Sequence, residues 1–308
     1  MTGSGLPTRV LGRTGLEVAR LGYGAMSLDD RFGRVISPDE ATQILNAVLD
    51  AGINYIDTSP DYGVSEELIG QAIAHRRSEY FLATKCGCPV SVEAGAGHVY
   101  TAENIVAAVE QSLRRMRTDY LDVVQFHGNP SMANLEAQGA IETLRELQRA
   151  GKVRFLGMSG TGERLRTQIA SGVFDVLQIP YSALQREDEG AIGLAAAESA
   201  GTVIRGGVAR GAPSEEKGWA IRRLPEVPED RPRALWEAAQ LDDLIEGESR
   251  MGFMLRFTLS HPDVHTTIVG TANLEHLRQN LEALGRGGLS TDVYAEAKRR
   301  LHEAAAVT

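Results

Sequence analysis

The 308-residue chain is poor in cysteine, with only Cys86 and Cys88. Two thiols are too few for the disulfide framework of a small secreted protein, and on their own they are too few for a zinc site. No stretch approaches the roughly 18 apolar residues of a membrane-spanning helix, and the first residues lack the apolar core of a signal peptide. We therefore expect a cytoplasmic protein without a membrane partner.

Positive charge is also scarce, since 32 Lys and Arg face 41 Asp and Glu for a net charge of −9. A nucleic-acid partner is not expected, because such surfaces are rich in Lys and Arg. No Gly-rich dinucleotide fingerprint or Walker loop follows an early strand. The 43% hydrophobic content is typical of a globular protein. Because no low-complexity linker divides the chain, we predict one domain over residues 1–308.

Short β-rich segments alternate with helical patterns along the chain. Parallel strands need crossover connections, and helices usually supply them. Eight strand–helix units favour closure into a (β/α)8 TIM barrel over an open sheet. The predicted strands are Arg20–Gly24, Asn54–Asp57, Tyr80–Lys85, Leu121–Phe126, Val153–Met158, Val176–Ile179, Thr202–Arg205 and His265–Val269.

Several helices are marked by their ends and by apolar spacing. Ser37-Pro38-Asp39-Glu40 is a capping box with proline in the first turn, and it begins a helix that Gly52 ends. A second helix starts at Thr101, and a third is predicted from about Asn134 to Gly151. An extra helix is predicted at the C-terminal end, over residues 291–305.

Two segments fall outside the strand–helix alternation. Thr8–Leu11 and Leu16–Ala19 flank a Gly-rich tetrapeptide, which predicts an N-terminal β-hairpin that plugs one end of the barrel. After the seventh strand, residues 212–232 carry four prolines and many charges. We interpret them as a long surface loop.

Polar side chains end three neighbouring strands: Asp57, Lys85 and His127, with Tyr62 five residues beyond Asp57. Active sites of such barrels lie at the carboxyl ends of the strands. A charge at the end of an apolar strand is unfavourable unless it is paired. Taken singly, the Asp–Lys pair could be structural, Tyr62 a packing side chain and His127 a core histidine. Their meeting at one rim favours an active site.

The segment from Asn54 to Gly63, together with Lys85 and His127, resembles the aldo-keto reductase superfamily. The resemblance extends from Gly12 to Asn280. It implies NAD(P)H-dependent reduction of an aldehyde or ketone, possibly sugar-like, to an alcohol. The expected assembly is a monomer or weak homo-oligomer, and the reaction needs no metal.

The resemblance implies a role for each of the four rim residues. Hydride addition to a carbonyl develops negative charge on oxygen, so a proton must arrive there. Tyr62 is the implied proton donor, and Lys85 stabilises the phenolate that remains. Asp57 holds Lys85 charged and oriented, while His127 binds the substrate oxygen.

The same resemblance implies cofactor-binding residues at further strand ends. Ser159 matches a residue that holds the nicotinamide carboxamide, whereas Gly160 stands where the family has asparagine. Gln178 matches a glutamine that binds the same carboxamide. Arg205 lies where an aromatic residue or an arginine faces the nicotinamide ring, and a guanidinium can stack there.

The segment after the last strand resembles the family's site for the adenosine 2′-phosphate. Thr271 and Asn280 match, whereas Gly270 replaces a lysine and His276 an arginine. Arg278 either compensates for the lost charge or lies on the solvent side. The helix that opens here suits an anion. We predict that NADP(H) is preferred and that NAD(H) is possible.

Substrate contacts are the least defined by sequence. Gly24, Ala25 and Met26 end the first barrel strand and are predicted to line the cofactor site, with Met26 also facing substrate. Asn129 follows the histidine, and Trp219 in the long loop either covers the mouth or pins its own loop.

Other polar residues near the rim are given no catalytic role. The two cysteines are read as small rim residues, with a redox role as the alternative, and Asp61 is expected to be solvated. Two other functions remain open for the whole chain. One is a cofactor-sensing regulatory subunit with little turnover, and the other is a barrel aldolase or isomerase that uses Lys85 in a Schiff base.

Overall fold

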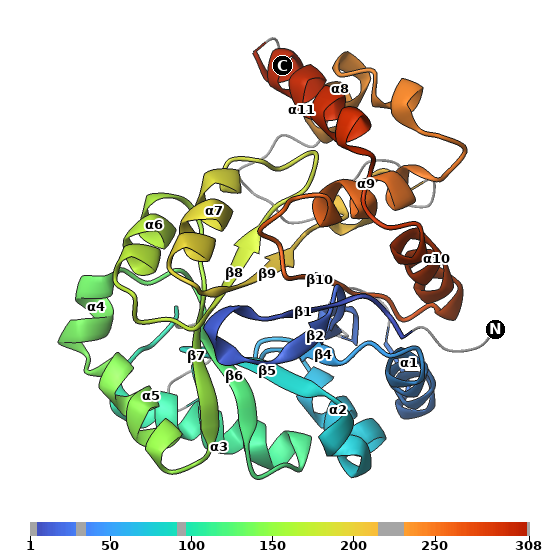
Figure 1. The fold of residues 1–308 in the computed structure, drawn as a ribbon. Helices are drawn as coiled ribbons and strands as arrows, with labels where there is room; N and C mark the ends of the chain where they lie inside the picture. The colour runs from blue at the N-terminus through green and yellow to red at the C-terminus, as the bar shows by residue number, and fades with distance from the viewer. Residues whose placement is uncertain (1–4, 29–34, 91–96, 215–230, 307–308) are drawn as a thin grey trace.

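Eight parallel strands close into a barrel in the computed structural model, which describes residues 5–28, 35–90, 97–214 and 231–306 (Figure 1). The strand order around the barrel is β10-β3-β4-β5-β6-β7-β8-β9. The predicted (β/α)8 architecture is therefore confirmed, and each strand end lies within one residue of its prediction. The strands are β3 Leu21–Gly24, β4 Tyr55–Asp57, β5 Phe81–Cys86, β6 Leu121–Phe126, β7 Val153–Ser159, β8 Val176–Pro180, β9 Gly201–Arg205 and β10 Thr266–Val269.

Helices surround the barrel, as Figure 1 shows. The α-helices are α1 Pro38–Asp50, α2 Ser65–Ile73, α3 Ala102–Met116, α4 Met132–Ala137, α5 Ala140–Arg149, α6 Gly162–Ala170, α7 Glu189–Ala197, α8 Arg231–Ala238, α9 Arg250–Leu259, α10 Leu274–Gly285 and α11 Thr291–Ala305. The 3-10 helices are η1 Gly12–Thr14, η2 Ala25–Leu28, η4 Ala74–Glu79, η5 Ala209–Gly211 and η6 Leu241–Leu244. Within the described ranges, no helix has the length and apolar character needed to cross a membrane.

The predicted helix ends are mostly confirmed, with two differences. The capping box at α1 forms, with the Glu40 amide donating to the Ser37 hydroxyl oxygen at 3.2 Å. The helix predicted over 134–151 is instead two helices, because Gly139 has a left-handed φ of 63° that ends α4 and begins α5. The end of the predicted loop is helical, since α8 begins at Arg231 and holds Pro232 in its first turn. Residues 215–230 of that loop lie outside the described residues.

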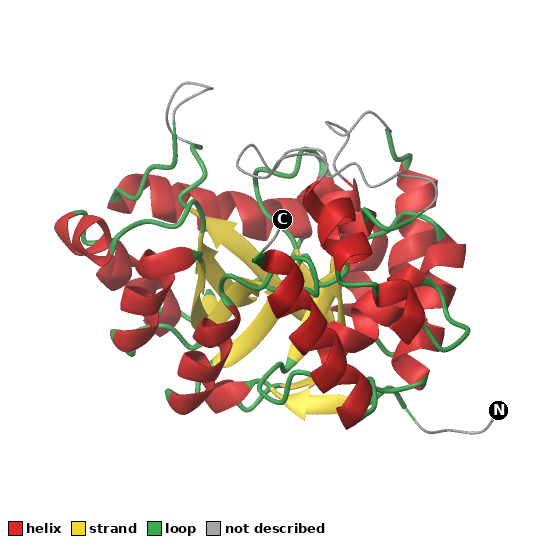
Figure 2. Cartoon of the chain, turned by 90° about the horizontal axis from the view of Figure 1, so that it is seen from above, coloured by secondary structure: helices red, strands yellow, loops and turns green. Residues whose placement is uncertain are grey.

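The N-terminal hairpin closes one end of the barrel. β1 (Thr8–Val10) pairs antiparallel with β2 (Glu17–Ala19), as predicted, and in Figure 2 it lies below the barrel strands. Apolar side chains of the hairpin segment pack against those inside the barrel. The cluster comprises Leu11, Leu16, Val18, Tyr55, Ala83, Val123, Val176 and Val203. The hairpin therefore plugs the amino-terminal end of the strands.

This apolar layer also positions the polar residues above it. Successive side chains of a strand alternate in direction, so positions two apart share one face. Two residues beyond Tyr55 comes Asp57, and two beyond Ala83 comes Lys85. The carboxyl ends of the strands, opposite the hairpin, thus receive polar side chains in the barrel interior.

Candidate active site

An ion pair between neighbouring strands forms the centre of the candidate site. The Lys85 ammonium donates to Asp57 Oδ2 at 2.8 Å and to the Thr58 carbonyl at 2.7 Å, and both charged side chains are buried. Burial alone would lower the pKa of Lys85, but the charge of Asp57 and the adjacent Tyr62 raise it above its usual value. Lys85 is therefore a fixed buried cation.

Asp57 also accepts hydrogen bonds from two buried glutamines. Gln125 Nε2 and Gln178 Nε2 each lie 2.8 Å from Asp57 Oδ1, so one carboxylate joins strands β4, β5, β6 and β8. The sequence reading did not identify Gln125. The sequence could have indicated Gln125, because it lies two residues before His127 and side chains two apart on a strand point to the same face.

Tyr62 reaches this ion pair from the loop after β4. The Tyr62 amide donates to the Ser59 carbonyl at 3.0 Å, and the Asp61 amide donates to Ser59 Oγ at 3.2 Å, which makes a tight turn. Lys85 Nζ lies 4.8 Å from the centre of the Tyr62 ring. The Tyr62 and His127 rings meet edge-on with centres 6.5 Å apart. The structure therefore brings the four predicted rim residues together.

The His127 imidazole contacts a carboxylate and a thiol that the sequence did not assign to the site. Its Nδ1 lies 3.4 Å from Asp61 Oδ2 and 3.4 Å from Cys88 Sγ. Burial lowers the pKa of His127, and the hydrogen bond to Asp61 only partly opposes this shift. We therefore expect a neutral imidazole at neutral pH.

Asp61 is 35% exposed, and its carboxylate also lies 3.6 Å from His98 Nε2, so it is partly solvated and at the same time engaged by two histidines. Hydrogen bonds from His127 and His98 hold the pKa of Asp61 well below its usual range. Burial raises the pKa of the neighbouring Cys88 thiol to about 12, so this cysteine is protonated and weakly nucleophilic.

The residues predicted to hold the nicotinamide lie beside the ion pair. Ser159 Oγ is 3.0 Å from Gln178 Oε1, and both side chains are buried at the ends of β7 and β8. A Cβ at Gly160 would lie 2.6 Å from Gln168 Oε1 and 2.9 Å from Asn129 Oδ1, so a larger residue here requires these two side-chain ends to move.

Other predicted contacts lie at the ends of the same strands. Arg205 ends β9, and Ala25 and Met26 lie in η2 directly after β3. Asn129, predicted to contact substrate, donates its amide to the Thr161 carbonyl at 3.1 Å and accepts from the Thr161 amide at 3.3 Å. It holds the loop after β7 in place. Trp219 lies outside the described residues.

The segment after β10 approaches β3 very closely. A Cβ on Gly270 would lie 2.4 Å from the Gly24 carbonyl oxygen, so only glycine fits there. The Tyr23 hydroxyl donates to the Thr271 carbonyl at 2.8 Å and ties the two segments together. This close approach explains why position 270 is glycine rather than the lysine that the family resemblance suggests.

Helix α10 carries the remaining residues predicted to bind the 2′-phosphate, His276 and Asn280, and both are partly buried. Arg278, the possible compensating cation, is exposed and forms ion pairs with Glu275 at 2.5 Å and with Glu282. Its charge is therefore shared with two carboxylates of the same helix.

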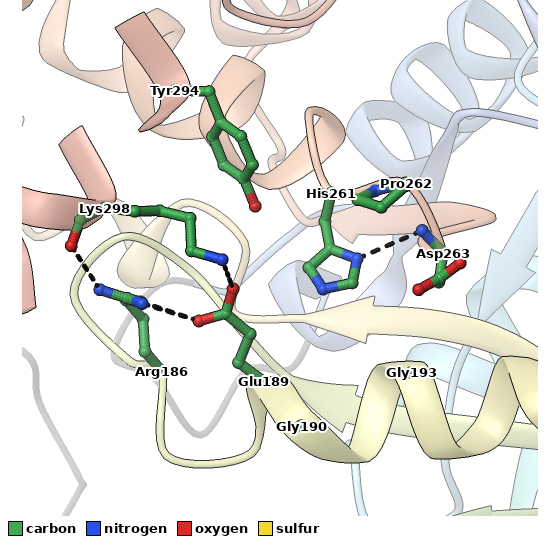
Figure 3. A pocket seen from close by; sticks show the side chains of 9 residues that line it. All are labelled: Arg186, Glu189, Gly190, Gly193, His261, Pro262, Asp263, Tyr294 and Lys298. Atoms are coloured by element: carbon green, nitrogen blue, oxygen red, sulfur yellow. Dashed lines mark hydrogen bonds and ion pairs between the residues drawn. The ribbon is translucent and has the colours of Figure 1, made fainter. Parts of the chain in front are cut away.

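A separate cavity of about 590 Å³ lies on the flank of the barrel (Figure 3). It is lined by residues of α7, α11 and the turn before β10, including His261 and Asp263. Its cations are already paired, because Arg186 and Lys298 both contact Glu189 at 2.9 and 2.5 Å. None of the four rim residues lines it.

The barrel and its rim define an oxidoreductase of the aldo-keto reductase type. A model of the Aldo/keto reductase family matches residues 20–300, so the chain belongs to that family. Family membership supports NAD(P)H-dependent carbonyl reduction in general terms.

Individual relatives agree with this assignment. The chain is 30% identical over 291 residues to an uncharacterised oxidoreductase, YqkF, of Bacillus subtilis, covering 89% of this chain and 90% of the relative. It is 28% identical to L-galactose dehydrogenase of Arabidopsis thaliana, covering 90% and 87%. Among solved structures, the aldo-keto reductase AKR11C1 from Bacillus halodurans matches with a TM-score of 0.81, 28% identity and 96% coverage of both chains.

Proposed function

We propose that this protein reduces an aldehyde or ketone to an alcohol, with Tyr62 as the proton donor. The observation that carries the proposal is the contact of the Tyr62 ring with a buried Lys85–Asp57 pair, next to the His127 imidazole. When bound, NAD(P)H supplies a hydride to the carbonyl carbon. The Tyr62 hydroxyl gives its proton to the carbonyl oxygen, and the Lys85 ammonium stabilises the phenolate that is left. A neutral His127 orients the same oxygen.

The structure has features that suit the nicotinamide cofactor. Ser159 and Gln178 form a buried pair with the hydroxyl and amide groups that a carboxamide needs. The close approach of Gly24 and Gly270 keeps Cβ atoms away from the rim between β3 and β10. We assign NADPH as the preferred cofactor with NADH also accepted. The preference should be small, because Arg278 is engaged by Glu275 and Glu282.

A hydroxylated, sugar-like carbonyl compound is the proposed substrate class. The support is the relative from Arabidopsis thaliana, whose name gives L-galactose as its substrate. A panel of sugars, hydroxyketones and simple aldehydes, assayed with the preferred cofactor, tests this part separately from the reaction itself.

Replacing Tyr62 by phenylalanine tests the reaction. Tyr62→Phe removes only the hydroxyl, so we expect turnover to fall by about 10²–10⁴-fold while cofactor affinity, measured by fluorescence titration, stays nearly unchanged. Equal turnover in wild type and variant contradicts the assigned proton donor.

Rapid-mixing experiments with NADPH and 4-nitrobenzaldehyde separate an enzyme from a cofactor sensor. Fast multiple turnovers support the reductase, whereas one slow oxidation per bound cofactor supports the sensor. A Schiff-base role for Lys85 is disfavoured, because its ammonium is buried and bonded to both Asp57 and the Thr58 carbonyl. Borohydride trapping of a carbonyl substrate on Lys85 would reverse that conclusion.

A further inference from the structure

A set of four potential metal ligands lies beside Tyr62, and we refer to it as the Asp61 cluster. Its members are Asp61, Cys88, His98 and His127. Each offers one oxygen, sulfur or nitrogen atom, and these four atoms all lie within 4.8 Å of one another. The residues come from three separate loops at the carboxyl ends of the strands, so the fold rather than local sequence brings them together.

The spacing of these atoms is close to that of a tetrahedral zinc site. With bonds of about 2.0–2.3 Å, tetrahedral ligands stand about 3.3–3.7 Å apart. The His127 Nδ1–Asp61 Oδ2 distance is 3.4 Å, and the His127 Nδ1–Cys88 Sγ distance is also 3.4 Å. His98 Nε2 lies 3.6 Å from the same Asp61 oxygen. The remaining pairs of ligand atoms lie within 4.8 Å of one another, so coordination of all four requires side-chain rotation.

The chemistry of the ligands favours zinc over harder cations. Imidazole and thiolate ligands bind Zn²⁺ strongly, whereas Mg²⁺ and Ca²⁺ prefer sites made of oxygen atoms. A positive charge already lies near, on Lys85, but its ion pair with Asp57 offsets the repulsion. Ser59 Oγ lies 3.6 Å from Cys88 Sγ and can support the sulfur from outside the cluster.

We propose that the Asp61 cluster binds one Zn²⁺ ion and that this ion reversibly inhibits the enzyme. Binding replaces the Cys88 thiol proton, which is released to solvent, by the metal. Because Zn²⁺ would bind His127 through Nδ1, it would draw the imidazole toward the Asp61 cluster and change how the other ring nitrogen meets the substrate oxygen. The inhibitory consequence rests on the proposed reductase function, whereas metal binding itself does not.

Direct binding is measured on the full-length, reduced and chelator-treated protein. Co²⁺ is added first as a spectroscopic probe, and we expect a sulfur-to-cobalt charge-transfer band with the intense visible bands of tetrahedral Co²⁺. One equivalent of Zn²⁺ should abolish both. Calorimetry with Zn²⁺ should give one site per chain, with an observed enthalpy that changes with the ionisation enthalpy of the buffer because a proton is released on binding.

Substitutions within the cluster test which residues bind the metal. His98→Gln changes an exposed side chain, and we expect it to weaken Zn²⁺ binding about tenfold or more. Cys88→Ser should remove the charge-transfer band. The matched controls are His75→Gln, an exposed histidine elsewhere, and Cys86→Ala, a cysteine outside the cluster. Circular dichroism verifies that each variant is folded.

The inference is overturned if Co²⁺ gives no sulfur charge-transfer band. It is also overturned if His98→Gln and His75→Gln bind Zn²⁺ as tightly as wild type, since binding is then adventitious. In activity assays, Zn²⁺ should inhibit wild type, and a chelator should restore its turnover. For His98→Gln, the turnover measured with Zn²⁺ should stay close to the turnover of the same variant without Zn²⁺. Zinc binding without any reductase activity would refute the proposed function and leave the metal site intact.

Discussion

Replacing Gly270 by lysine separates two expectations for the cofactor site. The resemblance to the aldo-keto reductases suggests that lysine here would add a cation for the 2′-phosphate and strengthen NADPH binding. The structure predicts the reverse. A Cβ at position 270 lies 2.4 Å from the Gly24 carbonyl oxygen, so one of the two segments must move by about 0.6 Å to reach even 3.0 Å. That movement disturbs the β3–β10 pairing, in which Val269 lies opposite Tyr23.

The expected loss of stability is that of an overpacked site. Forcing atoms into a packed region typically costs about 1–3 kcal/mol, and the contact here is with backbone rather than a flexible side chain. Gly270→Ala isolates this steric effect from the charge. Gly285→Ala is the matched control, because a Cβ there meets nothing within 4 Å at the end of helix α10. The control should be neutral or slightly stabilising.

Urea denaturation gives the stabilities, and fluorescence titration with NADPH and NADH gives the cofactor affinities. We expect Gly270→Ala and Gly270→Lys to unfold at lower urea concentration than wild type and Gly285→Ala. The ratio of NADPH to NADH affinity should not rise in Gly270→Lys. If Gly270→Ala is as stable as wild type, or if the lysine variant prefers NADPH more strongly, the steric argument is refuted.

Two further predictions concern buried charge. Asp57→Asn leaves the Lys85 ammonium without its counterion, so we expect a loss of about 3–5 kcal/mol in unfolding free energy together with a large loss of turnover. Adding Lys85→Met should restore much of the stability but none of the turnover, and additive effects on stability would contradict the coupling. Burial and the charges of Arg9 and Arg20 lower the pKa of His265 from 6.5 to about 4, so the unfolded chain binds more protons between these values. The free energy of unfolding should therefore fall by about 1–2 kcal/mol, allowing for solvent screening, as the pH drops from about 6.5 to 4. Urea midpoints measured across this pH range test the prediction, and in His265→Gln they should change less with pH.

The sequence was sufficient for the architecture because the barrel follows from local patterns. Eight apolar segments with helices between them permit few arrangements other than a closed parallel sheet. The prediction of a single helix over 134–151 was wrong, because apolar periodicity continues through Gly139 while its left-handed backbone ends the first helix. A glycine inside a periodic pattern does not reveal its φ from sequence alone.

From the strand pattern, the candidate site was predictable where residues follow the strands directly, and the family resemblance added Tyr62. Asp57, Lys85 and His127 take their places from strand ends, and strand ends are visible in the sequence. The contacts of Asp61 with His98 and of Cys88 with His127 were not foreseen, because each joins residues of two different loops and loop geometry decides their meeting. From the sequence, Gly270 was interpreted as the loss of a phosphate-binding lysine. The structure shows that the close Gly24 carbonyl requires glycine there, and such a contact between distant segments is not visible in one sequence.

The hairpin plug has a practical consequence for handling the protein. Because β1 and β2 cover the end of the barrel opposite the rim residues, a support attached through the hairpin leaves the rim facing outward (Figure 2). Immobilisation on an electrode or bead by that end should preserve access for small molecules. Attachment through an engineered anchor near the β4–α2 loop should instead obstruct it.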